Sequence, residues 1–74
     1  MKWEPDGKGY KVSYKKFYAP MNREITYEIL VRPFGDKQWF AKIGEVDSGY
    51  TYSTQQYEKM EDAAKRAFAV IDAR

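Results

Sequence analysis

The side chains that could do chemistry in this chain are carboxylates, lysines, serines and tyrosines, because its 74 residues include no histidine and no cysteine. The composition therefore excludes imidazole bases, thiol nucleophiles and zinc–thiolate sites. The serines Ser13, Ser48 and Ser53 have no imidazole to activate them. Tyrosines, lysines and carboxylates remain conceivable as acid–base groups, and the carboxylates are also candidates for metal chemistry.

Three carboxylates, Glu58, Glu61 and Asp62, lie close together in the sequence, ahead of Lys65 and Arg66. In a helix that begins near residue 59, these acids stabilise the positive end of the helix dipole. Glu61–Lys65 and Asp62–Arg66 also have the spacing of i,i+4 ion pairs. Because this structural role accounts for the cluster, we expect no catalytic residue, no metal site and no cofactor.

Basic and aromatic side chains are interleaved in the segments that resemble strands. Such a set on a sheet suits base stacking with phosphate contacts. An apolar centre with a charged rim equally suits a protein partner, and ordinary cross-strand pairing is the structural alternative. The candidate binding residues of this set are Lys11, Lys15, Phe17, Leu30, Arg32, Phe40 and Lys42. We add Tyr50 and Tyr52, which follow a glycine turn at 47–49 and are expected to be exposed.

Three strands are predicted by the alternation of apolar and polar side chains, and a fourth by a segment rich in Tyr and Thr. These strands cover residues 9–18, 24–32, 38–46 and 50–57. Residues 1–8 are interpreted as an N-terminal tail, because Pro5 and Gly7 interrupt regular structure. Residues 9–74 are predicted to form a single domain.

The last segment has the apolar spacing of a helix, with Met60, Ala64, Phe68 and Ile71 on one side. Its start is open between two positions. A capping box at Ser53 favours a start near 54, whereas a start near 59 leaves the fourth strand intact, and we prefer the later start.

The fold class that follows is α+β, with a three- to four-stranded antiparallel meander sheet and one C-terminal helix packed on one face. The other face of the sheet is expected to remain open to solvent. The predicted core comprises Val12, Tyr14, Ile25, Ile29, Val31, Trp39, Ile43, Met60, Ala64, Phe68 and Ile71.

The turn between the second and third strands decides their register. A two-residue Gly35-Asp36 turn would move the apolar residues of one strand to the opposite face from those of the other. A longer loop, residues 33–37, unites the apolar positions and is preferred. It pairs Val31 with Trp39, Ile29 with Ala41, Leu30 with Phe40 and Glu28 with Lys42.

Charge and hydropathy indicate which partners and which cellular location to expect. Residues 1–42 hold nine basic and five acidic residues and residues 43–74 hold four and six, so the net charge of +2 is distributed unevenly. This net positive charge is smaller than that of a typical nucleic-acid-binding domain. The N-terminus lacks the apolar stretch of a signal peptide and the longest apolar run is residues 67–71, so we expect a cytoplasmic protein.

The segment Lys59-Met60-Glu61-Asp62-Ala63-Ala64-Lys65-Arg66-Ala67, after a run of strands, resembles the sheet-plus-helix end of double-stranded RNA-binding domains. That family has a helix before the sheet and a Ser-Lys-Lys cluster opening the last helix. This chain has neither, so no RNA-contacting residue is carried over. The order of elements is also similar to that of the three-stranded-sheet DNA-binding domains of phage integrases.

As a whole, a 74-residue sheet-and-helix chain whose last segment contains Met60-Glu61-Asp62-Ala63-Ala64-Lys65 resembles small accessory proteins of phages and mobile elements, anti-CRISPR inhibitors included. The resemblance, with the absence of a catalytic constellation, suggests a non-enzymatic protein that occupies a surface of a larger protein or nucleoprotein complex. Two alternatives stay open. One is nucleic-acid binding through the basic and aromatic residues, and the other is a homodimer that pairs through a strand edge.

Overall fold

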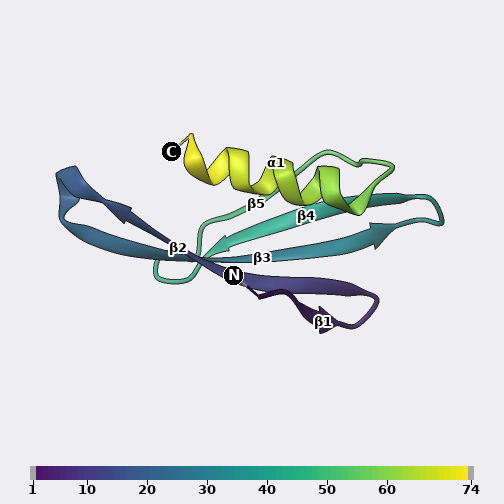
Figure 1. Cartoon of the computed structure of the whole chain (residues 1–74), viewed down its shortest axis with the longest axis horizontal. Coiled ribbons are helices and arrows are strands. Elements are labelled where there is room, and N and C mark those ends of the chain that lie inside the picture. Colours follow the sequence, from purple (N-terminus) through teal and green to yellow (C-terminus); the bar gives the residue numbers. More distant parts are fainter. Residues whose placement is uncertain (1, 74) are drawn as a thin grey trace.

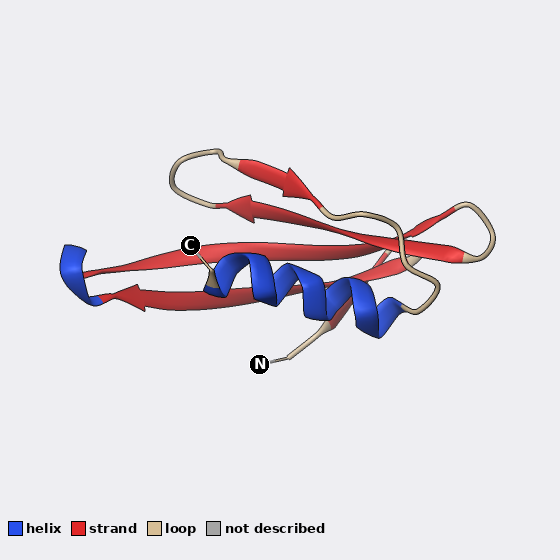
Figure 2. Ribbon diagram, turned by 90° about the horizontal axis from the view of Figure 1, so that it is seen from above, coloured by secondary structure: helices blue, strands red, loops and turns tan. Residues whose placement is uncertain are grey.

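The computed structural model describes residues 2–73. Its strands form a single antiparallel sheet in the order β1-β2-β3-β4-β5. The helix α1 runs along one face of this sheet (Figures 1 and 2). The elements are β1 (Glu4–Asp6), β2 (Gly9–Tyr18), a 3-10 turn at Ala19–Met21, β3 (Arg23–Phe34), β4 (Gln38–Glu45), β5 (Thr51–Ser53) and α1 (Met60–Asp72). The predicted α+β class is therefore confirmed, with five strands in place of three or four.

The first strand lies in the segment that was predicted to be an N-terminal tail. Gly7, at φ +61°, turns the chain so that β1 pairs with the start of β2. Pro5 is tolerated because β1 is an edge strand, where a missing N–H breaks no essential ladder bond. The expectation that Pro5 and Gly7 prevent regular structure here was wrong.

The last strand is shorter than the predicted 50–57, because Thr54 interrupts it. The buried Thr54 hydroxyl accepts a hydrogen bond from Ala41 N at 2.9 Å and donates one to Gln55 O at 2.9 Å. Pairing with β4 resumes at an isolated bridge, where Trp39 and Tyr57 exchange two backbone bonds of 2.7 Å. One threonine side chain thus replaces a backbone partner and keeps the edge of β4 satisfied.

The core lies between α1 and the sheet. Ala63, Ala67 and Ile71 of the helix are fully buried, as are Ile29 and Ala41 of β3 and β4. The small alanines let the helix backbone approach the sheet closely. Every residue predicted for the core either belongs to this buried cluster or packs against it, whereas the buried residues Tyr27, Ala41, Ala63 and Ala67 were not predicted. The helix begins at Met60, which confirms the later of the two predicted starts.

The register of β3 and β4 is displaced by two residues from the preferred one. Ile29 lies opposite Ile43, Val31 opposite Ala41, Leu30 opposite Lys42 and Glu28 opposite Gly44. The connecting loop has three residues, 35–37, and starts at Gly35 with φ +68°. The predicted pairs were wrong, but a displacement by two leaves every side chain on its predicted face.

Gly9 of β2 lies opposite Asp6 of β1 and close to the backbone of β3. A Cβ atom built on Gly9 would overlap the carbonyl oxygen of Val31 and crowd Arg32 Cα at 3.2 Å. A Cβ at Gly44, in β4, would meet nothing within 4 Å. The two strand glycines therefore differ sharply in the space around them.

Lys16 connects β2 to the C-terminal end of α1. Its ammonium group donates hydrogen bonds to Ile71 O at 3.1 Å and Asp72 O at 3.0 Å, and lies 3.9 Å from the Asp72 carboxylate. A cation here complements the negative end of the helix. The neighbouring Tyr14 hydroxyl donates to Asp72 Oδ1 at 3.1 Å, and this bond raises the pKa of Tyr14 above its ordinary value.

We expect Gly9→Ala to lower the free energy of unfolding by about 1–3 kcal/mol, because the new methyl group must displace backbone rather than a flexible side chain. Gly44→Ala is the matched control and should change stability by about 0.5 kcal/mol or less. Urea denaturation followed by circular dichroism measures both. Equal midpoints for the two variants would contradict the close approach at Gly9.

We expect Lys16→Met to lower the free energy of unfolding by about 1–2 kcal/mol, because two charge-assisted bonds to the end of α1 are lost. The control is Lys15→Met, one residue earlier, whose exposed side chain lies on the other face. Thermal unfolding distinguishes them. The interpretation fails if Lys15→Met destabilises the protein as much as Lys16→Met.

Candidate binding surface

The open sheet face is the side of the sheet opposite α1, and no element within residues 2–73 covers it (Figures 1 and 2). Side chains alternate across each strand, so the register determines which residues lie on this face. All seven strand residues predicted for binding do: Lys11, Lys15, Phe17, Leu30, Arg32, Phe40 and Lys42.

The centre of the open sheet face is apolar and half-buried. Leu30 lies between Lys11 of β2 and Lys42 of β4, which are its direct cross-strand neighbours. Beside it, Phe40 meets Phe34 edge to face, with ring centroids 6.1 Å apart and an interplanar angle of 87°. The Phe34 side chain is 50% exposed. An aliphatic and aromatic centre is thus flanked by lysines.

Arg32 is held in place across a strand. Its Nη2 atom lies 3.2 Å from Asp6 Oδ2, although β2 separates β3 from β1. The residue of β2 opposite Asp6 is Gly9, which has no side chain to obstruct the arginine. Because this pair is substantially exposed, it contributes little to stability, but it orients the guanidinium over the sheet.

Phe17 lies on the open sheet face but far from its centre. It sits on the β2–β3 hairpin, which extends past the C-terminal end of α1 (Figure 1). Its cross-strand partner Glu24 is six residues from Leu30, which corresponds to about 20 Å along the strand. Phe17 is 58% exposed and Val46, near the same end, is 60% exposed. Phe17 and Val46 are therefore exposed apolar side chains that lie apart from the centre of the face.

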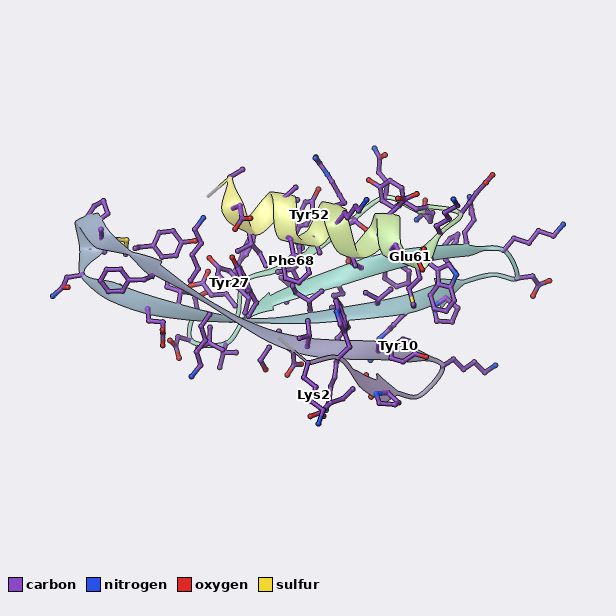
Figure 3. The ribbon with its side chains drawn as sticks, viewed as in Figure 1. Lys2, Tyr10, Tyr27, Tyr52, Glu61 and Phe68 are labelled. Carbon is purple, nitrogen blue, oxygen red and sulfur yellow. The ribbon has the colours of Figure 1, made fainter. Side chains whose placement is uncertain are left out.

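Tyr50 and Tyr52 do not join the open sheet face. They are partly exposed, as expected, but Tyr52 lies opposite Ile43, whose side chain is in the core beneath α1. Figure 3 shows Tyr52 on the helix side of the sheet. Tyr50, two residues earlier, has the same parity as Tyr52. The expected exposure is confirmed, and the pairing of β5 with β4 separates Tyr52 from the basic residues of the open sheet face.

Charges of both signs are mixed on the open sheet face. Its acidic residues are Glu4, Asp6, Glu24 and Glu28, and its basic residues are Lys2, Lys11, Lys15, Arg32 and Lys42. A shallow hollow of about 420 Å³ illustrates the mixture, since Lys2, Glu4, Lys11 and Glu28 share its lining. Within residues 2–73, no group of three carboxylates is placed to hold a metal ion.

Three residues of this surface were not predicted from the sequence. Asp6 was assigned to the tail, and Phe34 and Val46 were assigned to no functional set. A signal was available for Phe34, because an aromatic residue that alternates in phase with Arg32 at the end of a strand shares its face. No sequence signal pairs Asp6 with Arg32, since their contact depends on two successive hairpins.

The described part of the chain contains no helix with the length and apolar character needed to cross a membrane. Comparison of the chain with protein-family models, with curated proteins and with solved structures found no match.

Proposed function

We propose that this protein is a non-enzymatic binding protein that occupies a surface of a larger protein or nucleoprotein complex through its open sheet face. The observation that carries the proposal is the half-buried centre at Leu30 and Phe40 on a face that no described element covers. An apolar centre surrounded by charged side chains has the organisation of a protein interface.

Arg32 and the aromatic pair supply the expected anchors. Arginine and aromatic residues dominate the binding energy of interfaces. The contact between Arg32 and Asp6 orients the guanidinium before binding, which reduces the entropy lost when a partner is engaged. The lysines Lys11 and Lys42 would fix the orientation of the bound partner and increase the rate of association.

The size of the face is consistent with a stable complex. The molecule measures 42 × 21 × 21 Å, so its broad side spans roughly 900 Å² in projection, close to the share of one partner in an interface of standard size. A tight complex would therefore use most of the face, including Phe17 at its far end.

The resemblance to small phage accessory proteins gives the proposal a more specific form. In that form the partner is a component of a host defence system, and the protein inhibits it in the cytoplasm as anti-CRISPR-type proteins do. The support is the size and style of the chain, together with a rigid sheet that displays a broad contact surface.

Nucleic-acid binding through the same face is the second candidate. Its support is that Lys11, Lys15 and Lys42 make no ion pair within the described residues, so their ammonium groups are available to phosphates. The four carboxylates on the face weigh against it, because they would repel a phosphate backbone. We therefore favour a protein surface.

Two variants test the proposed contact surface. Phe40→Ala and Arg32→Glu should each weaken capture of the partner from bacterial lysate by about tenfold or more, because each removes an anchor. Arg66→Glu, an equal charge reversal on the exposed side of α1, should leave capture unchanged. Circular dichroism must show a native fold for all three. Full capture by both open-face variants would exclude this surface.

Fluorescence anisotropy with labelled single- and double-stranded DNA and RNA separates the two candidates. A protein-binding surface predicts no binding at physiological salt. Tight binding that falls steeply with salt, and is lost when Lys11, Lys15 and Arg32 are reversed in charge, would establish the nucleic-acid alternative instead.

A further inference from the structure

A pocket of about 240 Å³ lies on the helix side of the sheet, between the first turns of α1 and the β1–β2 edge. Figure 3 shows Tyr10 on β2 and Glu61 on α1, both toward the same end of the molecule. The lining residues are Trp3, Tyr10, Val31, Met60, Glu61 and Ala64. This pocket is separated from the open sheet face by the sheet itself.

The aromatic walls of the pocket are positioned by β1. Trp3 immediately precedes β1, and its ring packs edge to face on Phe68 of α1, with centroids 6.2 Å apart and an interplanar angle of 85°. Tyr10 lies opposite Pro5 of β1 on one side and Val31 of β3 on the other. Its side chain is 39% exposed, so the ring can be reached from solvent.

Glu61 is the one charged residue that borders this otherwise apolar pocket. Glu61 lies in the first turn of α1. Within residues 2–73, its side chain makes no ion pair and no hydrogen bond. The other lining groups are two aromatic rings, a thioether and aliphatic side chains. Aromatic faces attract cations, and a carboxylate beside them strengthens that attraction.

The scarcity of hydrogen-bond acceptors restricts the kind of cation. A free lysine ammonium has three N–H donors, and burying it here would leave most of them unsatisfied. A fully methylated ammonium has no donor and presents apolar methyl groups while keeping its charge. The volume of about 240 Å³ is below that of usual small-molecule sites, which favours a single side chain as the occupant.

We propose that this pocket binds a trimethylated lysine side chain of a partner protein. The trimethylammonium group lies against Trp3 and Tyr10, its charge is balanced by Glu61, and its alkyl stem packs on Met60. The site is on the opposite side of the sheet from the proposed contact surface, so the two proposals stand or fall separately.

The test is a titration of the ¹⁵N-labelled protein, followed by NMR, with Nα-acetyl-trimethyllysine amide. Chemical-shift changes should be confined to residues around the pocket. Nα-acetyl-lysine amide, whose side-chain ammonium is unmethylated, should bind about 3- to 30-fold more weakly than the trimethylated ligand, as expected for the loss of a desolvated cation–π contact. The affinity for the neutral analogue, which has a tert-butyl group in place of trimethylammonium, should be lower by a similar factor.

Variants with matched controls locate the site. Glu61→Gln should weaken binding severalfold, whereas Asp62→Asn, in the same turn but outside the lining, should not. Tyr10→Leu should abolish binding, whereas Tyr52→Leu, a similarly exposed tyrosine elsewhere on the helix side, should not. Glu61→Gln is a surface change that preserves the fold, so it remains informative if Tyr10→Leu does not fold.

Three results would overturn the proposal. Equal binding of the tert-butyl analogue would mean that the pocket recognises shape and not charge. Choline binding as tightly as the acetyl-trimethyllysine amide would assign the pocket to a free quaternary ammonium compound. An absence of shifts around the pocket up to the solubility limit of the ligand would exclude a site altogether. Phe40→Ala should retain trimethyllysine binding, which keeps the result independent of the open sheet face.

Discussion

The burial of one apolar sheet face beneath a single helix is the constraint on which the rest of this structure depends. Ala63, Ala67 and Ile71 of α1 are fully buried against the sheet, and the two alanines allow a close approach. A chain of 74 residues has little apolar surface to spare, and one helix covers only one face. The other face must therefore be stable in water, which explains its mixture of charges around a small apolar centre.

The position of the helix also decides what the two sides of the molecule can do. Lys16 holds the C-terminal end of α1 through its last carbonyl groups, and Trp3 packs on Phe68 from the β1 side. Between the first turns of α1 and the β1–β2 edge the packing is incomplete, and the apolar pocket remains there. One side of the sheet thus offers a small apolar pocket that is open to solvent, and the other offers a broad surface.

Contacts between distant segments give the open sheet face its order. Gly9 lets the start of β2 lie close to the backbone of β3 and leaves room for Arg32 to reach Asp6. The same hairpin that forms β1 carries Trp3 to the helix. The short segment 3–6 therefore contributes to both surfaces, because Asp6 contacts Arg32 on the open sheet face and Trp3 lines the pocket on the helix side.

The sequence by itself determined the class of fold, the alternation of side chains within each long strand and the presence of the C-terminal helix. It could do so because the two-residue period of a strand and the 3.6-residue period of a helix are local properties of the backbone, and the apolar residues follow them. The shared face of Lys11, Leu30, Arg32 and Phe40 followed from that alternation together with the preferred longer loop between the second and third strands. Only the tertiary structure decided the register, because a displacement by two residues preserves every face and is invisible to the pattern. The tertiary structure likewise placed Tyr50 and Tyr52 on the helix side, made a strand of 4–6, and brought Trp3 to Glu61, because each of these depends on packing between segments that are far apart in the chain.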